Sequence, residues 1–498
     1  MMVERRVSKL FLLLPALAAG LLLSLLFLFD VVFPVEVSVL LLLLVTTWGL
    51  VWFRTGHISL LLRLSIVIYV LPFNKTLEYL WGGTPVLYPT PLATMLSTDR
   101  PLVSQMLMLA LVGLLGLLVG FGLVIFFRRD AHFATEPDFS QPLPTLDHVS
   151  FWVALLAAVA FSWMSAQPET ILTTPYMQGP DSFATTLNFN SAYTVSYALL
   201  FLLFIDAERE HTNLWRRQWK LLAILGATIF ITVFLQFLRG DREVISLLVG
   251  LMALYITSPA VRRPMYQSMT QPPQSNTMVS RSKREWRRVA RLIAPIVVIA
   301  IVASILGSVR RTLSQSDAPL DVVDALVENL EYGTWNAISL TNLGIAMKYR
   351  YDDIDYLYGQ TFVEYAMSLP PGFITSALGI ERPLEGNRGP AWWFVGIGSG
   401  GIHIALVPFR NFGIFGVFVI VMIYGWCIAQ CELASYRAAV WQRMLYAAMV
   451  STLPLWFWYG DMYIIRVLMV AALAVLAYHL ALRLGEQVLP GRFPSPVR

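Results

Sequence analysis

Long apolar runs separated by short polar stretches dominate the chain. A helix needs about 20 apolar residues to cross the hydrocarbon core of a bilayer, because each residue adds ~1.5 Å to its length. Runs of this kind recur along the whole sequence, and they predict an all-α, polytopic membrane bundle of about twelve transmembrane helices. The predicted spans are roughly 10–29, 33–53, 57–73, 103–127, 150–166, 188–205, 221–238, 243–260, 291–308, 405–426, 440–458 and 462–482.

The charged residues set the expected orientation of these spans. The 498-residue chain is 57% hydrophobic and 13% charged, with a mean hydropathy of +0.64, whereas soluble proteins carry about 25% charged residues. With the N-terminus in the cytoplasm, Lys and Arg concentrate in the predicted inner loops. Most of the net charge of +5 is therefore topological, and it indicates no nucleic-acid partner. One such inner loop is marked by Arg209, Arg216, Arg217 and Lys220.

The predicted spans divide the chain into three parts. Residues 1–308 hold transmembrane helices 1–9 with short loops, 309–404 form a large outer loop with short helices, and 405–498 hold helices 10–12 and a cytoplasmic C-terminus. The first apolar run continues to Phe29, which is long enough for an uncleaved membrane anchor rather than a signal peptide. An even number of spans places both termini in the cytoplasm.

Arginines gather on the predicted outer side of the membrane, where the positive-inside rule makes them scarce. A guanidinium group stays protonated and forms paired, charge-assisted hydrogen bonds to phosphate, so the cluster indicates an anionic, phosphate-bearing ligand. The alternative is that these arginines pair with nearby acids, such as Asp241 and Asp461, and only end helices or balance charge. The candidate ligands of a diphosphate are Arg239, Arg242, Arg310, Arg311, Arg382, Arg388, Arg410 and Arg466.

One histidine falls on the predicted outer face. His403 follows the glycine-rich stretch 398–402, and an unperturbed imidazole titrates near pH ~6.5, which suits proton transfer. His403 is therefore the first candidate for a general base. Its rivals are carboxylates of the outer loop, and the alternative for every one of them is a solvated or hydrogen-bonded residue without a chemical role. These rivals are Glu364, Glu381 and Glu385.

Aromatic side chains in the outer loop suit the faces of sugar rings and equally suit the membrane interface. The candidates for glycan binding are Tyr358, Trp392 and Trp393. The acidic stretch 352–355 favours a solvated turn over a metal site. Two cysteines four positions apart, Cys427 and Cys431, indicate helix packing rather than a disulfide or a zinc site. We expect no metal and no cofactor.

Three motifs occur in order along the C-terminal half. The first is Phe237-Leu238-Arg239-Gly240-Asp241-Arg242, with Gly250 further along the same span. The second is Tyr358-Gly359-Gln360-Thr361, followed by Pro370-Pro371 and Arg382-Pro383. The third combines Gly400-Gly401 with Asn411-Phe412-Gly413-Ile414-Phe415-Gly416. Their order and spacing resemble the oligosaccharide repeat-unit polymerases (the O-antigen polymerase, or Wzy, family). The chain departs from that family at Val407, where relatives often have a Glu.

The resemblance implies a glycosyltransferase of the bacterial inner membrane with a periplasmic active site. Such an enzyme transfers a growing oligosaccharide from polyprenyl diphosphate onto a lipid-linked repeat unit. Its implied partners are polyprenyl-diphosphate-linked oligosaccharides and membrane lipid, with a chain-length regulator as a further candidate. The arginines would hold the departing diphosphate in place of a metal, and His403 or a Glu would act as base.

Three other functions fit parts of the same pattern. An O-antigen ligase shares the substrates and the arginines, although its expected outer histidine-asparagine pattern is not evident. A metal-dependent GT-C type glycosyltransferase would need acids in the first outer loop, where only Asp30 and Glu36 occur. A flippase or secondary transporter of lipid-linked glycans is the non-enzymatic alternative. It would place charges at mid-bilayer, and apart from Arg63 and Arg466 the predicted spans carry few.

Overall fold

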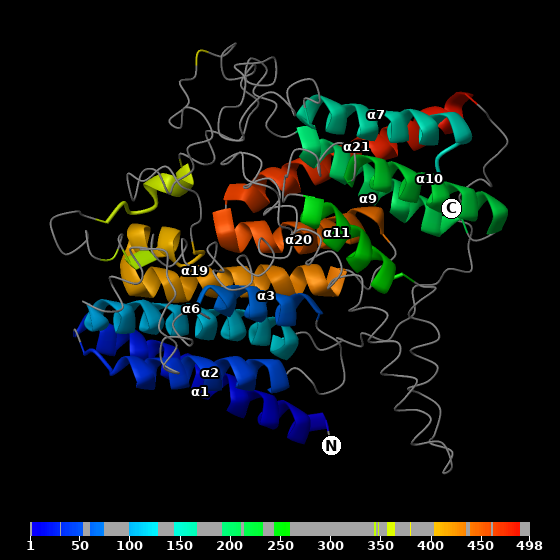
Figure 1. Ribbon diagram of the computed structural model, residues 1–498. Coiled ribbons are helices and arrows are strands. Elements are labelled where there is room, and N and C mark those ends of the chain that lie inside the picture. Colours follow the sequence, from blue (N-terminus) through cyan, green and yellow to red (C-terminus); the bar gives the residue numbers. More distant parts are fainter. Residues whose placement is uncertain are drawn as a thin grey trace, which may run out of the picture. The chain divides into compact units, whose positions relative to one another are not determined.

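The structure is a computed structural model in which every described secondary-structure element is a helix and no strand occurs (Figure 1). The prediction of an all-α chain is therefore confirmed for these residues. They are 2–29, 31–52, 60–73, 99–127, 144–166, 192–210, 214–232, 244–258, 343–344, 347, 356–363, 379, 403–434, 439–459 and 462–488.

Within these residues, three helices are long and apolar enough to cross a membrane, judged by length and composition: Arg100–Val124, Leu406–Ala434 and Val467–Leu484. Shorter apolar helices cover Leu14–Leu28, Val35–Val51, Leu61–Phe73, His148–Met164 and Ser246–Ile256. The apolar helices support a membrane protein. A bundle of about twelve spans stays a prediction, and its expected ninth span, 291–308, lies outside the described residues.

The chain divides into two compact units. The first takes Met1–Glu136, Leu330–Ala434 and Thr452–Arg466, and the second takes Pro137–Asn329, Ser435–Ser451 and Val467–Arg498. The predicted division at 308/309 and 404/405 follows expected membrane crossings rather than packing, so these units do not test it.

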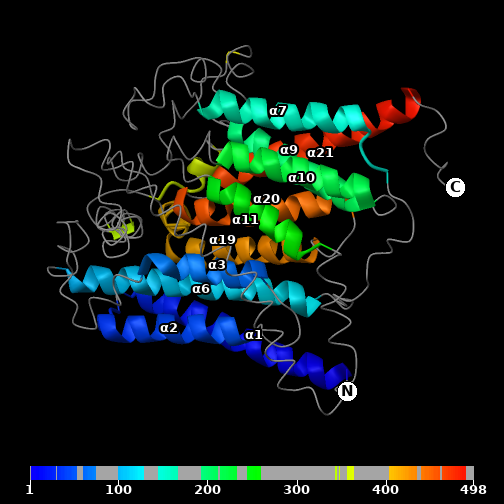
Figure 2. The ribbon, with the colours of Figure 1, turned by 45° about the vertical axis from the view of Figure 1, so that its right-hand side comes forward.

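In the first unit, α6 (Arg100–Phe127) is the central helix. It is buried along almost its whole length, and it lies between the α1/α2 pair and α19 in both views (Figures 1 and 2). The helices around it are α1 (Met2–Leu28), α2 (Val35–Trp52), α3 (Leu60–Val70) with the 3₁₀ turn η1 (Leu71–Phe73), and α19 (Leu406–Ala434).

Glycines let α6 and α19 approach each other closely. A Cβ at Gly116 would meet the main-chain oxygen of Phe418, and a Cβ at Gly120 would meet that of Met422. From the other helix, a Cβ at Gly425 would meet the main chain of Leu117. Small residues four apart permit such backbone contact between apolar helices. The α6–α19 pair is thus a parallel, tightly packed core.

The second unit contains α7 (His148–Ala166), α9 (Ala192–Arg209), α10 (Leu214–Phe230) and α11 (Val244–Ile256). It also holds the first part of α20 (Val440–Tyr459) and most of α21 (Met462–Val488). α9 packs against α7, α10 and α11. Gly250 of α11 serves this packing, because a Cβ there would clash with the ring of Phe201 on α9.

Polar contacts fix the relative directions of two helix pairs, one in each unit. α3 runs antiparallel to α19, since the amide of Leu61 bonds to Glu432 and Tyr69 contacts His403. α7 runs antiparallel to α9, since Leu146 meets Asp206 at one end and Ser162 meets Ser196 at the other. Which side faces the cytoplasm stays a prediction.

The predicted boundaries were wrong where polar residues continue a helix. α9 extends to Arg209 and α10 begins at Leu214, so Arg209, Arg216, Arg217 and Lys220 lie in helices and not in the expected inner loop. The physical reason is that Asp206 and Glu210, at the end of α9, neutralise Lys220 and Arg216, so these side chains do not need the solvent of a loop.

Candidate functional site

The structure describes only some of the side chains that the sequence nominates. His403, Arg410 and Tyr358 are described, and the backbone of Arg466 lies in α21. The remaining candidates lie outside the described residues, and their roles stay predictions. These are Glu364, Glu381, Glu385, Arg239, Arg242, Arg310, Arg311, Arg382, Arg388, Trp392 and Trp393.

The start of α19 is broken at Gly413, which has φ 68° and ψ −157°. This backbone region is essentially reserved for glycine, and it interrupts the regular i to i−4 ladder of the helix. Two carbonyl oxygens just before the break accept bonds from another segment. Leu357 N donates to Arg410 O at 3.1 Å, and Tyr358 N donates to Asn411 O at 3.0 Å. The break thus gives segment 356–359 a place to dock.

The docked segment forms a tight turn. Gln360 N donates to Leu357 O at 2.8 Å, and the two central residues both have positive φ, 46° at Tyr358 and 89° at Gly359. These are the marks of a type I′ turn, which favours Asn, Asp or Gly at its centre. Gly359 fits that preference, whereas a bulky tyrosine at φ 46° is strained.

The side chain of Asn411 fastens this turn to α19. It is fully buried. Its Oδ1 accepts from Gly359 N at 2.9 Å, and its Nδ2 donates to Thr361 Oγ1 at 2.6 Å and to Val407 O at 2.8 Å. The amide therefore satisfies three polar groups at the helix break, which only a side chain with both donors and an acceptor can do.

These contacts join two of the three motifs found in the sequence. Tyr358-Gly359-Gln360-Thr361 meets Asn411-Phe412-Gly413, and the stacked rings of Phe362 and Phe412, 6.4 Å apart, extend the contact. Sequence reasoning placed both motifs near the outer membrane surface but did not pair them. The signal that could have paired them is the isolated asparagine before a glycine at the start of an apolar span.

Arg410 lies at the same helix break, and we call residues 410–413 the elbow. Arg410 is only 5% exposed. Its main-chain oxygen accepts from Leu357, and its neighbour Asn411 clamps the turn. Arg410 is thus the one described candidate arginine whose side-chain placement is known, and the structure puts it beside the joined motifs. The prediction that it holds phosphate is untested.

His403 occupies a different environment from the one expected of a general base. Its ring is fully buried against Tyr69 and Phe73, with ring centres 4.8 and 5.3 Å away. Nδ1 accepts from Ala405 N at 3.3 Å, so the neutral ring carries its proton on Nε2, which donates to Tyr69 O at 3.1 Å. Burial lowers the pKa of His403 to about 4. Because both nitrogens are engaged, this arrangement favours a structural role over proton transfer.

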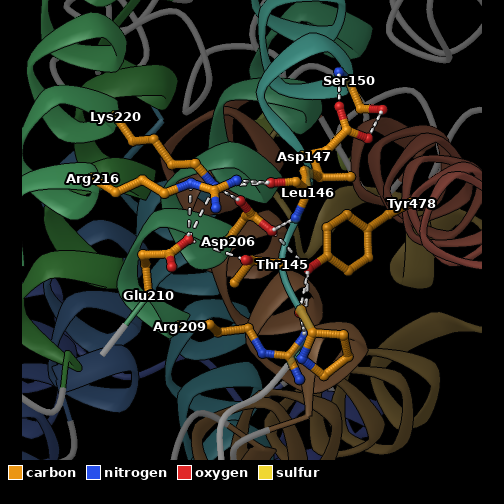
Figure 3. Close-up of polar contacts among 11 residues, drawn as sticks. Thr145, Leu146, Asp147, Ser150, Asp206, Arg209, Glu210, Arg216, Lys220 and Tyr478 are labelled. Carbon is orange, nitrogen blue, oxygen red and sulfur yellow. Dashed lines mark hydrogen bonds and ion pairs between the residues drawn. The ribbon is translucent and has the colours of Figure 1, made fainter. Parts of the chain in front are cut away.

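A second polar centre, in the other unit, was not expected from the sequence (Figure 3). Asp206 of α9 and Lys220 of α10 are both fully buried and form an ion pair of 2.8 Å. Asp206 also accepts from Leu146 N and from the hydroxyl of Tyr478. Lys220 donates to Leu146 O at 3.3 Å and lies 3.6 Å from Glu210 Oε2. Each charged side chain of this polar centre therefore lies beside an opposite charge or several hydrogen-bonding groups.

Further contacts extend the centre. Arg216 pairs with Glu210 at 3.5 Å and donates to Leu146 O, while Thr145 donates to Glu210. We call the set Thr145, Leu146, Asp206, Glu210, Arg216, Lys220 and Tyr478 the polar hub. Its saturated hydrogen bonding is that of a structural clamp between α7, α9, α10 and α21 rather than of an open binding site.

A separate buried ion pair joins Glu208 of α9 to Arg443 of α20, in the same unit. Glu208 lies in the last turn of α9 and Arg443 in the first turn of α20, so the pair leaves the prediction of few charges at mid-bilayer untested. Both this pair and the polar hub lie near helix ends that the sequence predicts to be cytoplasmic.

Cys427 and Cys431 of α19 are both free thiols. Among the described residues, no cluster of His, Cys, Asp and Glu is placed to hold a metal ion. Comparisons of the chain with protein-family models, with curated proteins and with solved structures find no match.

Proposed function

We propose that this chain is a glycan polymerase of the bacterial inner membrane. It would transfer a growing oligosaccharide from polyprenyl diphosphate onto a lipid-linked repeat unit at the periplasmic face. The observation that carries the proposal is the junction at Asn411. Two motifs that resemble those of repeat-unit polymerases, 50 residues apart in the chain, meet there at the broken start of a candidate membrane span.

The proposed reaction needs two chemical contributions from the protein, which are stabilisation of the leaving diphosphate and a base for the acceptor proton. A hydroxyl of the acceptor sugar attacks the anomeric carbon of the donor, the bond from that carbon to the diphosphate oxygen breaks, and the diphosphate leaves with the electron pair. The acceptor proton passes to a base. Arginine suits the leaving group, because its fixed charge stabilises the developing negative charge without a metal. Arg410 is the described candidate for this task, at the elbow.

The surroundings of His403 favour another residue as the base in this proposal. Since both its ring nitrogens are engaged within the protein, the outer-loop carboxylates become the preferred candidates in this proposal. They are Glu364, Glu381 and Glu385.

The direct test is reconstitution. The purified protein in lipid nanodiscs is supplied with lipid-linked repeat units isolated from producing cells that lack this gene, and products are separated by gel electrophoresis. Ladders of two or more repeats support polymerisation, and their absence with folded protein refutes it. Transfer to an acceptor in a single step would indicate a ligase, and activity abolished by a chelator would indicate the metal-dependent GT-C class.

The non-enzymatic alternative has its own readout. The same repeat units, loaded on one leaflet of a proteoliposome, report translocation through their accessibility to an added glycosidase. Translocation without ladders would assign the chain to the flippases.

A further inference from the structure

Tyr358 is an unusual residue for the turn position that it occupies. The residue is 77% exposed, and its backbone has φ 46° at a turn position that Asn, Asp or Gly fill without strain. Its edge-on contact with Tyr356, with ring centres 6.3 Å apart, covers little of the ring. The ring therefore gains little from packing to offset the strained backbone, and strain of this kind is common at ligand sites.

Asn411 enforces that conformation. It accepts from both Tyr358 N, through its main chain, and Gly359 N, through its side chain, and it also holds Thr361. Because Asn411 is fully buried and these bonds reach both sides of the turn, the exposed ring of Tyr358 is presented from a rigid base.

The turn stands at the end of an apolar stripe. On α19 beyond its break, exposed apolar side chains recur at helical spacing along a candidate membrane span, and Phe412, just before the break, contacts the turn through Gly359 and Phe362. A lipid-linked saccharide has the same order, an apolar tail followed by sugars. The stripe consists of Phe412, Phe415, Val419, Ile423 and Trp426.

We infer that Tyr358 is a contact for the sugar ring next to the lipid carrier, and that Asn411 is the residue that positions it. The inference rests on the proposed function. The flat face of a tyrosine suits the C–H face of a pyranose, and its hydroxyl suits the polar side of the membrane interface. A sugar contact, unlike a packing residue, accounts for an aromatic ring that is both strained and exposed.

The test measures the binding of two probes to the purified protein in nanodiscs. One probe is the lipid-linked repeat unit, and the other is polyprenyl diphosphate without sugar. Tyr358→Asn should weaken binding of the first about tenfold, which is ~1.4 kcal/mol, and leave the second unchanged. Tyr358→Phe keeps the ring and should bind both probes normally. Equal weakening of both probes would assign Tyr358 to the lipid tail, and no weakening would assign it to membrane anchoring, and either result overturns the inference.

The melting temperature of the same variant distinguishes a sugar contact from a structural residue. Tyr358→Asn relieves strain, so its melting temperature should rise by about 2 °C while sugar binding falls. A variant that loses both would point to a merely structural tyrosine and contradict the inference.

Asn411→Asp tests the positioning role. The carboxylate is nearly the same size but lacks the two N–H donors, so it should weaken repeat-unit binding and lower the melting temperature. If Asn411 acts through Tyr358, the double variant Tyr358→Asn/Asn411→Asp binds the repeat unit no worse than Tyr358→Asn alone. Additive losses would refute the positioning role.

The binding and ladder experiments distinguish failure of the polymerase proposal from failure of the inference about Tyr358. If the wild type binds the repeat unit but builds no ladders, polymerisation is refuted, and the two-probe comparison still decides the role of Tyr358. If the wild type binds neither probe, both proposals are refuted. Binding and ladders together with normal affinity in Tyr358→Asn would refute the inference alone.

Discussion

The carboxylate of Asp206 lies 2.8 Å from the ammonium group of Lys220, and neither side chain has any exposed surface. The two residues are 14 positions apart and belong to consecutive helices. Removing two charges from water costs several kcal/mol per ion, and a partner together with further hydrogen bonds offsets that cost. Leu146 and Tyr478 supply those bonds to Asp206 (Figure 3).

The polar hub predicts strong coupling between its two central charges. Lys220→Met leaves Asp206 buried without its cation and should destabilise the protein by ~3–5 kcal/mol, measured by thermal melting in detergent. Adding Asp206→Asn should recover much of the loss, because the neutral pair has no charge to compensate. Arg100→Met is the control: its pair with Glu36 is more than half exposed and should be worth ~0–1 kcal/mol. Additive losses in the double variant would contradict the coupling.

The helix break at Gly413 predicts opposite outcomes for two glycine-to-alanine changes. Gly413→Ala forces an L residue to φ 68° and brings its Cβ to 2.6 Å from the Tyr356 hydroxyl, so we expect a loss of ~1–3 kcal/mol. Gly226 lies inside α10, where an added Cβ would have nothing within 4 Å, so Gly226→Ala should stabilise by ~0.5–1 kcal/mol. Melting temperatures that move in the same direction would argue against the break.

The sequence predicts where helices occur better than it predicts which polar residues of different helices contact each other, and the reason is physical. Long apolar runs indicate where a membrane chain is helical, because a helix satisfies its backbone hydrogen bonds within its own segment. The pattern does not say which polar ends meet. Asp206 and Lys220 look like ordinary loop-edge charges until α9 and α10 are packed together.

At the candidate site too, the sequence does not predict the contact between the two segments that meet at the elbow. Tyr358-Gly359 predicts a turn and Asn411-Phe412-Gly413 marks the start of a span, but the bond between them depends on a helix break that periodicity cannot reveal. The sequence favours His403 as a base because of its residue type and its predicted place on the outer face. Its burial against Tyr69 could not be foreseen without the packing of α3 on α19.

The burial of His403 predicts a pH dependence of stability. Its pKa falls from 6.5 to about 4 in the folded protein, so the unfolded chain binds a proton between these values while the folded chain does not. Stability should therefore be lost as the pH falls from about 6.5 to about 4, and be independent of this group above 6.5. His403→Phe should melt lower at pH 7.5 but show a shallower decline on acidification. An unchanged slope would exclude His403 as the source.

The proposed diphosphate contact predicts a kinetic effect at Arg410. If its charge stabilises the leaving group, Arg410→Gln should lower the rate of ladder formation ~10²-fold or more. Arg100→Gln, at another predicted outer helix end but in an exposed pair, is the matched control and should retain the wild-type rate. A near-normal rate for a folded Arg410→Gln protein would assign this buried side chain to structure alone.

The contact between α6 and α19 predicts that two alanines facing the same helix differ sharply. At Gly20 of α1, an added Cβ meets only the ring of Phe418, a side chain that can rotate away. At Gly120 of α6, it meets the main chain of Met422 and comes within 2.8 Å of Trp426 N, and neither group can move without shifting α19. Gly120→Ala should therefore cost ~1–3 kcal/mol or more from overpacking.

Gly20→Ala should change stability by much less than this, because relief of the backbone entropy of glycine offsets the ring movement. Thermal melting of the two variants in the same detergent makes the comparison. Since both alanines sit in helices and press on α19, differences in helix propensity cancel. Equal melting temperatures would mean that α6 and α19 are not held at backbone contact.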